Sequence, residues 1–176
     1  MFDTSIFFYT LAILFLIAIA LWIASRIKKD VGIVDSFWSL MILVAGFCFL
    51  AFTDTIITDR HSIVMLLLTV WAIRLAVHIT WRNWGQEEDS RYQTIRNNNQ
   101  PNFDLKSLYI VFLLQAFLAV VVALPLMSVF SSDSDINNLD YIALALWFTG
   151  MFFETVGDQQ LARFKSSSSN QNKVLN

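Results

Sequence analysis

The sequence predicts an all-α, polytopic membrane protein with about five transmembrane helices. Of its 176 residues, 56% are hydrophobic and only 15% are charged, whereas soluble domains are roughly 45–50% apolar and about 25% charged. The apolar residues gather in five long runs, and a spanning helix needs about 20 mostly apolar residues. The net charge of −2 offers no basic surface to nucleic acid. These observations exclude a disordered chain, a nucleic-acid binder and most soluble enzymes.

The first two runs are almost purely apolar. Residues 6–24 carry no charge, Asp3 precedes them and Arg26 follows. A cleavable signal peptide has its basic residues in front, so we expect an uncleaved helix. The second run covers residues 37–52, and Asp35 stands just before it. An aspartate there is either a helix cap or a functional carboxylate, and the spacing leaves both interpretations open.

The third run, residues 63–79, contains Arg74 and His78. An ionisable side chain in lipid is costly unless it is paired or hydrated. Trp71, Arg74, His78 and Arg82 are spaced to lie on one helical face. Either Arg74 snorkels while His78 bonds to a neighbouring helix, or this face lines a polar cavity that opens to the cytoplasm.

The last two runs cover residues 108–130, with Gln115 and Pro125 inside, and residues 141–157, with Glu154 inside. Glu154 and Asp158 share a face with Lys165, and Arg163 lies beside it. This face is either a wall that binds a polar ligand or a repulsive carboxylate pair relieved by water and Lys165. We expect one transmembrane domain over residues 1–176, ending in a loop-like tail over residues 165–176.

The basic residues predict the orientation. Ten of the 12 lie at alternate ends of the runs, which must face one side of the membrane. Because basic residues favour the cytoplasmic side, the amino terminus is predicted outside and the carboxy terminus in the cytoplasm. The polar groups around Asp35, Arg82 and Asp158 all fall at this cytoplasmic end. The charged segment 82–92 reads by default as a solvated loop, but its proximity to these groups favours a site.

The scarcity of some residue types limits the chemistry further. Cys48 is the single cysteine, which excludes a disulfide within the chain, and His61 and His78 are the only histidines. We therefore expect no metal site. The chain also lacks the Gly-x-Gly-x-x-Gly pattern, which excludes a soluble Rossmann-type dehydrogenase.

Several motifs together resemble one family. They are Val34-Asp35-x-x-Trp38-Ser39, Trp71-Ala72-x-Arg74-Leu75-x-x-His78-Ile79-x-x-Arg82, Glu88-Asp89-x-Arg91-Tyr92-x-x-x-Arg96 and Phe153-Glu154-x-x-x-Asp158-x-Gln160-Leu161-x-x-Phe164-Lys165. This order is similar to that of the bacterial DUF1295 membrane proteins, which are related to steroid 5α-reductases and more distantly to isoprenylcysteine carboxyl methyltransferases. The resemblance covers residues 30–176.

The resemblance implies an NADPH-dependent reductase that acts on an activated carbon–carbon double bond in a lipophilic substrate, in a bacterial inner membrane with its site facing the cytoplasm. Asp35 matches an acidic residue that positions the substrate carbonyl, and Arg74 or His78 is expected to polarise that carbonyl. The residues expected to bind the cofactor are Arg82, Glu88, Asp89, Arg91, Tyr92, Glu154, Asp158, Arg163 and Lys165. Glu154 and Lys165 stand where the steroid enzymes have Asn and Arg.

Members of the family usually continue into a Tyr-x-Arg-His-Pro-Asn-Tyr segment, which these 176 residues do not contain. We therefore expect the chain to be a carboxy-terminally truncated member. Two other functions stay open. One is an S-adenosylmethionine-dependent enzyme like the isoprenylcysteine methyltransferases, and the other is a non-catalytic membrane remnant.

Overall fold

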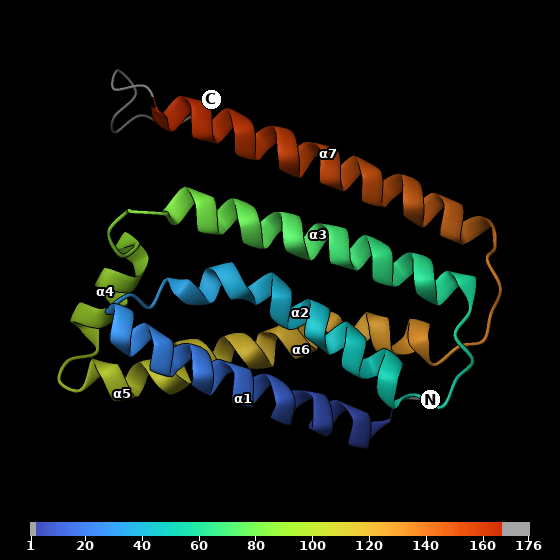
Figure 1. Ribbon diagram of the computed structural model, residues 1–176, viewed down its shortest axis with the longest axis horizontal. Coiled ribbons are helices and arrows are strands. Elements are labelled where there is room, and N and C mark those ends of the chain that lie inside the picture. Colours follow the sequence, from blue (N-terminus) through green and yellow to red (C-terminus); the bar gives the residue numbers. More distant parts are fainter. Residues whose placement is uncertain (1–2, 167–176) are drawn as a thin grey trace. The chain divides into compact units, whose positions relative to one another are not determined.

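The computed structural model describes residues 3–166, and every regular element among them is helical (Figure 1). In chain order the elements are α1 (Thr4–Lys28), α2 (Ile33–Phe52), α3 (Asp59–Asn83), α4 (Ser90–Asn98), α5 (Phe103–Ser107), the π-helix η1 (Leu108–Leu113), α6 (Leu114–Phe130) and α7 (Asn138–Ser166). Five stretches are long and apolar enough to cross a bilayer: α1, α2, α3, the run from α5 through α6, and α7. The prediction of an all-helical, polytopic membrane protein is confirmed.

The helices are longer than the apolar runs that predict them. Helix α2 begins at Ile33 instead of residue 37, so Asp35 lies inside its first turn and Gly32 occupies the cap position. Asp35 is therefore not the cap that one interpretation expected. Helix α7 continues to Ser166, so the loop-like tail predicted from residue 165 is wrong for residues 165–166. The rest of that tail lies outside the described residues. Helices extend past the apolar runs because charged residues are hydrated once the helix reaches the interface.

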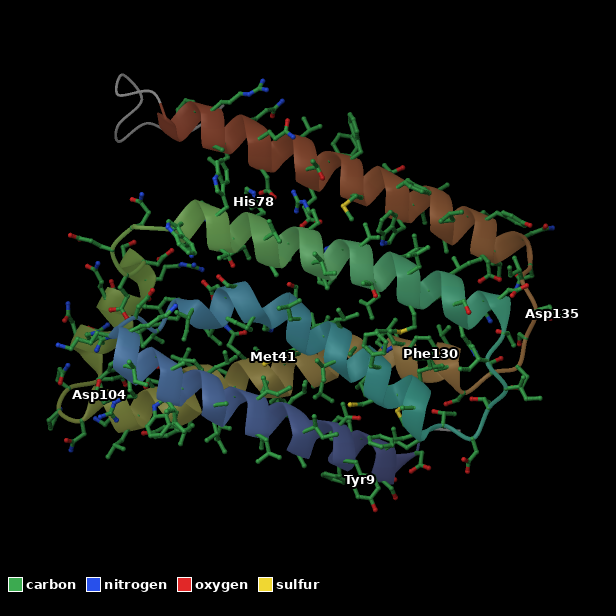
Figure 2. The ribbon with its side chains drawn as sticks, viewed as in Figure 1. Tyr9, Met41, His78, Asp104, Phe130 and Asp135 are labelled. Carbon is green, nitrogen blue, oxygen red and sulfur yellow. The ribbon has the colours of Figure 1, made fainter. Side chains whose placement is uncertain are left out.

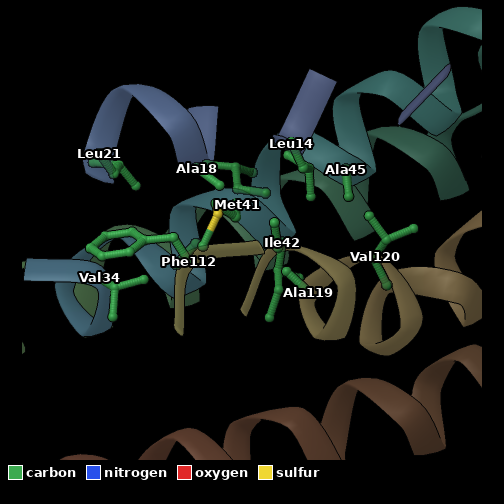
Figure 3. Close-up of a cluster of buried hydrophobic side chains, with 14 of the residues drawn as sticks. Leu14, Ala18, Leu21, Val34, Met41, Ile42, Ala45, Phe112, Ala119 and Val120 are labelled. Atoms are coloured by element: carbon green, nitrogen blue, oxygen red, sulfur yellow. The ribbon is translucent and has the colours of Figure 1, made fainter. Parts of the chain in front are cut away.

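The chain divides into two compact units, Met1–Ser134 and Asp135–Asn176. In the first unit α2 is central and packs against α1, α3 and α6, while α1 also packs against η1 and α6. Figure 3 shows the shared core, in which Leu14 and Ala18 of α1 meet Met41 of α2 and Phe112 of η1. In the second unit α7 stands as one long helix. A single domain over the whole chain stays a prediction.

Small side chains let α2 and α3 approach closely. The Ser39 hydroxyl donates a 2.9 Å hydrogen bond to the Ala72 carbonyl oxygen, and Ala72 and Ala76 are both buried. A Cβ atom added at Gly46 would lie only 2.6 Å from a methyl carbon of Leu68. Helices in membranes pack through such small residues because lipid gives no hydrophobic driving force for their association.

The end of the unit near Phe130 is held by His61. Its Nδ1 accepts the Thr58 backbone N–H at 3.4 Å, so Nε2 carries the proton and lies 3.2 Å from the Val129 and 3.0 Å from the Ser132 carbonyl oxygens. His61 is fully buried and joins the start of α3 to the end of α6. These contacts give His61 a structural role in joining the two helices.

Candidate functional site

The candidate site lies at the opposite end of the first unit. There α1 ends, α2 begins and α3 leads through a short loop into α4 (Figure 1). Lys29 adopts a left-handed conformation that ends α1, and the Asp30 carboxylate accepts the Gly32 N–H at 2.8 Å. Asp89 begins α4 by accepting the Arg91 N–H at 2.9 Å. The charged segment predicted as a loop, residues 82–92, thus leads into the short helix α4, from which Arg91 and Tyr92 reach α2.

Asp35 is the centre of this cluster. The Tyr92 hydroxyl donates to Asp35 Oδ1 at 2.5 Å, and Arg91 Nη2 donates to Asp35 Oδ2 at 3.0 Å. The Tyr92 side chain is buried and Asp35 is 18% exposed. Both oxygens of Asp35 therefore have a donor from α4, 56 and 57 residues further along the chain. We call Asp35, Asp89, Arg91 and Tyr92 the carboxylate cluster.

Arg91 forms a two-pronged contact with Asp89 as well. Its Nε lies 3.0 Å from Oδ1 and its Nη2 lies 3.1 Å from Oδ2. The hydrogen bond from Arg91 is the main reason that the pKa of Asp89 falls below its ordinary value, and the same bond raises the pKa of Arg91. Because the Arg91 side chain is 64% exposed, this pair adds little stability. It fixes a cation beside Asp35.

Tyr92 is held as a hydrogen-bond donor. Burial is the larger cause and the hydrogen bond to Asp35 the second cause of a pKa far above the ordinary tyrosine value of 10.0. Burial disfavours the charged phenolate, and the nearby carboxylate disfavours it further. The Tyr92 hydroxyl therefore keeps its proton at any physiological pH.

Glu88 and Arg96 form a second pair beside the cluster. Arg96 donates from Nε at 3.0 Å and from Nη2 at 2.7 Å to the two oxygens of Glu88, and the Val31 N–H donates to Glu88 Oε1 at 2.9 Å. Burial tends to raise the pKa of Glu88, but these donors and the charge of Arg96 outweigh it and lower that pKa. Glu88 therefore stays ionised at neutral pH.

The structure does not bring Arg74 and His78 to Asp35. Helix α3 packs on α2 through Ala72 and Ala76. Each residue of an α-helix is turned about 100° from the one before it, so Arg74 lies about 200° and His78 about 240° around the helix axis from Ala72. His78 accordingly lies on the side of α3 away from α2 (Figure 2). The two residues do share a face, as the spacing predicts, and Arg82 lies exposed near the end of α3.

The predicted residues of the second unit lie along α7. Glu154 and Asp158 are one turn apart and Arg163 follows, so the shared face is present on a continuous helix. The Lys165 side chain lies outside the description. The joining of this face to Asp35 stays a prediction.

An apolar groove of about 410 Å³ runs between α2 and α3 at the same end of the first unit. It starts at Ser36, the neighbour of Asp35, and its lining is Ser36, Phe37, Leu40, Ala76, Val77, Thr80, Trp81 and Trp84. Exposed tryptophans at a helix end are typical of the membrane interface. The groove therefore offers an apolar surface near the carboxylate cluster.

Sequence reasoning assigned Glu88, Asp89, Arg91 and Tyr92 to the site but left out Arg96. Tyr92 and Arg96 are four residues apart within α4, so a helix predicted over residues 90–98 would have placed these two on one face. Within residues 3–166 no group of His, Cys, Asp and Glu side chains could hold a metal ion.

This fold and site define a polytopic helical membrane protein with a hydrogen-bonded carboxylate cluster at one end of the bundle. Residues 21–176 match the sequence profile of a family described as "Protein of unknown function (DUF1295)", and the chain belongs to that family. Searches of curated proteins and of solved structures gave no match.

Proposed function

We propose that this protein is a membrane oxidoreductase that reduces an activated carbon–carbon double bond in a lipophilic substrate, using NADPH. The observation that supports this best is the pair of Asp35 and Tyr92. A buried hydroxyl that keeps its proton, held 2.5 Å from a carboxylate, is suited to bind a carbonyl oxygen on which negative charge develops. The similarity to steroid 5α-reductases supplies the reaction class.

In this proposal the substrate carbonyl replaces Asp35 as the acceptor of the Tyr92 hydrogen bond. Arg91 keeps Asp35 in place from its other oxygen, so the carboxylate stays beside the site after the Tyr92 hydroxyl has turned to the substrate. Polarising the carbonyl makes the carbon at the far end of the double bond electron-poor. NADPH would supply the hydride for this carbon, and a proton from water would complete the reduction at the carbon next to the carbonyl. Arg74 and His78 stay proposed as alternative polarising groups, and unchanged turnover after each separate substitution would remove them.

The donors in the cluster are compatible with a dinucleotide. The bonds from Arg91 to Asp35 and Asp89 use Nε and Nη2 on a largely exposed side chain, so a phosphate oxygen can reach Nη1. Arg82 lies exposed nearby in sequence. We propose Arg163, Lys165, Glu154 and Asp158 as the contribution of α7, and Asp89 and Tyr92 as neighbours of the bound cofactor.

The groove between α2 and α3 supports the apolar nature of the substrate. Ligand sites for apolar molecules combine an apolar wall with a few polar groups that set orientation. Here the wall begins one residue after Asp35. The excess of basic residues at this end favours a cytoplasmic position, in a bacterial inner membrane.

The test uses the native full-length protein, whose length is first established by intact mass, purified in detergent. We expect NADPH binding and NADPH oxidation that depends on an apolar enone. Asp35→Asn and Tyr92→Phe should each lower kcat at least about tenfold, while Glu87→Gln, a nearby exposed site, should not. Binding of S-adenosylmethionine in place of NADPH would favour a methyltransferase, and binding of neither would favour a non-catalytic protein.

A further inference from the structure

Glu88 differs from its neighbour Asp89 because its bonds point into the protein. Its side chain is 11% exposed, and its oxygens accept one backbone and two guanidinium hydrogen bonds. Asp89, by comparison, bonds only within its own turn and to the exposed Arg91. A carboxylate whose oxygens are already occupied by internal donors is poorly placed to contact a cofactor.

Arg96 connects this carboxylate to two more elements. Its guanidinium lies 4.6 Å from the centre of the Phe103 ring and 3.6 Å from Asp104 Oδ1, both on α5. The Asp104 carbonyl oxygen in turn accepts a 2.8 Å hydrogen bond from Trp22 Nε1 of α1. Figure 2 shows Asp104 at this end of the bundle. The network thus runs from the α1–α2 turn through α4 to α5 and back to α1.

Tyr92 lies between Glu88 and Arg96 in the chain. Tyr92 is in the first turn of α4 and Arg96 is in its last, and their four-residue spacing places these two on one side of the helix. Glu88 precedes α4 by two residues and is held at Arg96 by its two hydrogen bonds. The Tyr92 ring also packs near Gly32, where an added Cβ atom would be 3.6 Å from Cδ2. A nine-residue helix is marginal by itself in water, so tertiary contacts must fix its position.

We propose that the Glu88–Arg96 pair is a positioning device that fastens α4 at both ends to the α1–α2 turn and to α5, and so holds the Tyr92 hydroxyl on Asp35. This assigns Glu88 a role different from contact with the cofactor. The proposal rests on the proposed function only in taking the Asp35–Tyr92 pair as the reacting site. The geometry that carries it does not depend on any substrate.

The test follows the Tyr92 phenol directly, without substrate or cofactor. The full chain is prepared in detergent with ring-labelled tyrosine, and the signal that disappears in Tyr92→Phe is assigned to Tyr92. In the parent protein we expect that signal to titrate well above the ordinary tyrosine pKa. In Glu88→Gln, which keeps the shape but loses the charge and one of the two oxygens that accept from Arg96, the midpoint should fall by at least about one pH unit.

Glu87→Gln is the matched control, because it makes the same chemical change one residue earlier at an exposed site. It should leave the Tyr92 titration unchanged. Arg96→Lys keeps the charge but loses the two-pronged contact, so it should lower the midpoint in the same direction by a smaller amount. If Glu88→Gln does not fold, Arg96→Lys decides by the same measurement.

Two further results separate this proposal from the proposed function. Glu88→Gln should leave the Kd for NADPH within about twofold while it lowers kcat, since the residue acts through Tyr92. An unchanged Tyr92 titration, or a Kd for NADPH at least about tenfold weaker with that titration intact, would overturn the positioning role. Failure of the parent chain to bind NADPH would refute the reductase alone, because the Tyr92 measurement stands without it.

Discussion

Tyr92→Phe is the sharpest test of the carboxylate cluster, because it removes one hydroxyl and leaves the aromatic ring. Tyr92 is 6% exposed, and its ring packs beside Gly32. Phenylalanine keeps the ring and its packing and lacks only the hydroxyl. The measured loss of stability therefore reports on the 2.5 Å hydrogen bond to Asp35.

The size of the effect follows from the partners. A hydrogen bond to a charged group contributes about 1.5–3 kcal/mol. Asp35 retains its bond from Arg91 and is partly exposed, so water replaces part of what is lost. We expect a fall of about 2 kcal/mol in the free energy of unfolding, which is a change of roughly 30-fold in the unfolding equilibrium.

The assay is reversible unfolding in mixed micelles at neutral pH, followed by circular dichroism. Tyr109→Phe is the control, because this tyrosine is 58% exposed and its substitution should cost less than about 0.5 kcal/mol. If Tyr92→Phe were no more destabilising than Tyr109→Phe, the hydroxyl would not hold Asp35 and the reasoning above would be refuted.

Four other outcomes follow from the same contacts. The pKa of Glu88 is lowered in the folded protein, so ionised Glu88 contributes to the free energy of unfolding above pH 4.5, and this contribution is lost as pH falls through the lowered pKa. The slope of the free energy of unfolding against pH in this range should therefore flatten in Glu88→Gln. The pKa of Tyr92 is raised in the folded protein, so its protonated hydroxyl contributes to the free energy of unfolding below pH 10.0, and this contribution is lost as pH rises through the raised pKa. An equally steep loss of stability at alkaline pH in Tyr92→Phe would contradict this. His61→Ala should cost about 1–3 kcal/mol in the same unfolding assay, since it leaves buried groups without partners. Gly46→Val should cost about 1–3 kcal/mol by overpacking against Leu68, and an unchanged unfolding midpoint would show that α2 and α3 can separate at no cost.

The residues of the carboxylate cluster could be predicted from the order of motifs, but their pairing could not. Asp35 and Tyr92 are 57 residues apart, and nothing in the spacing states which carboxylate a given hydroxyl will meet. Arg96 was named in the motif but given no site role, because no helix was predicted over residues 90–98 to bring it beside Glu88. The helix there is held by tertiary contacts, which a local pattern does not contain.

The polar face of α3 also shows what residue spacing can and cannot predict. The spacing of Arg74 and His78 correctly predicts that they share a face. The direction of that face is decided by Ala72 and Ala76, whose small side chains let the α3 backbone approach α2. A polar residue in a span must avoid lipid, but that requirement by itself does not say which neighbour it will face.

The sequence by itself determined that the chain is helical, that five helices are long enough to span a bilayer, and where each one lies, although α7 continues to Ser166, well past the predicted end at residue 157. The physical reason is local, because the bilayer requires each span to satisfy its own backbone hydrogen bonds and to be mostly apolar. Only the tertiary structure decided that Glu88 binds the α1–α2 turn and that Tyr92 reaches Asp35. Those contacts depend on how α4 docks, and docking is set by groups that lie far apart in the chain.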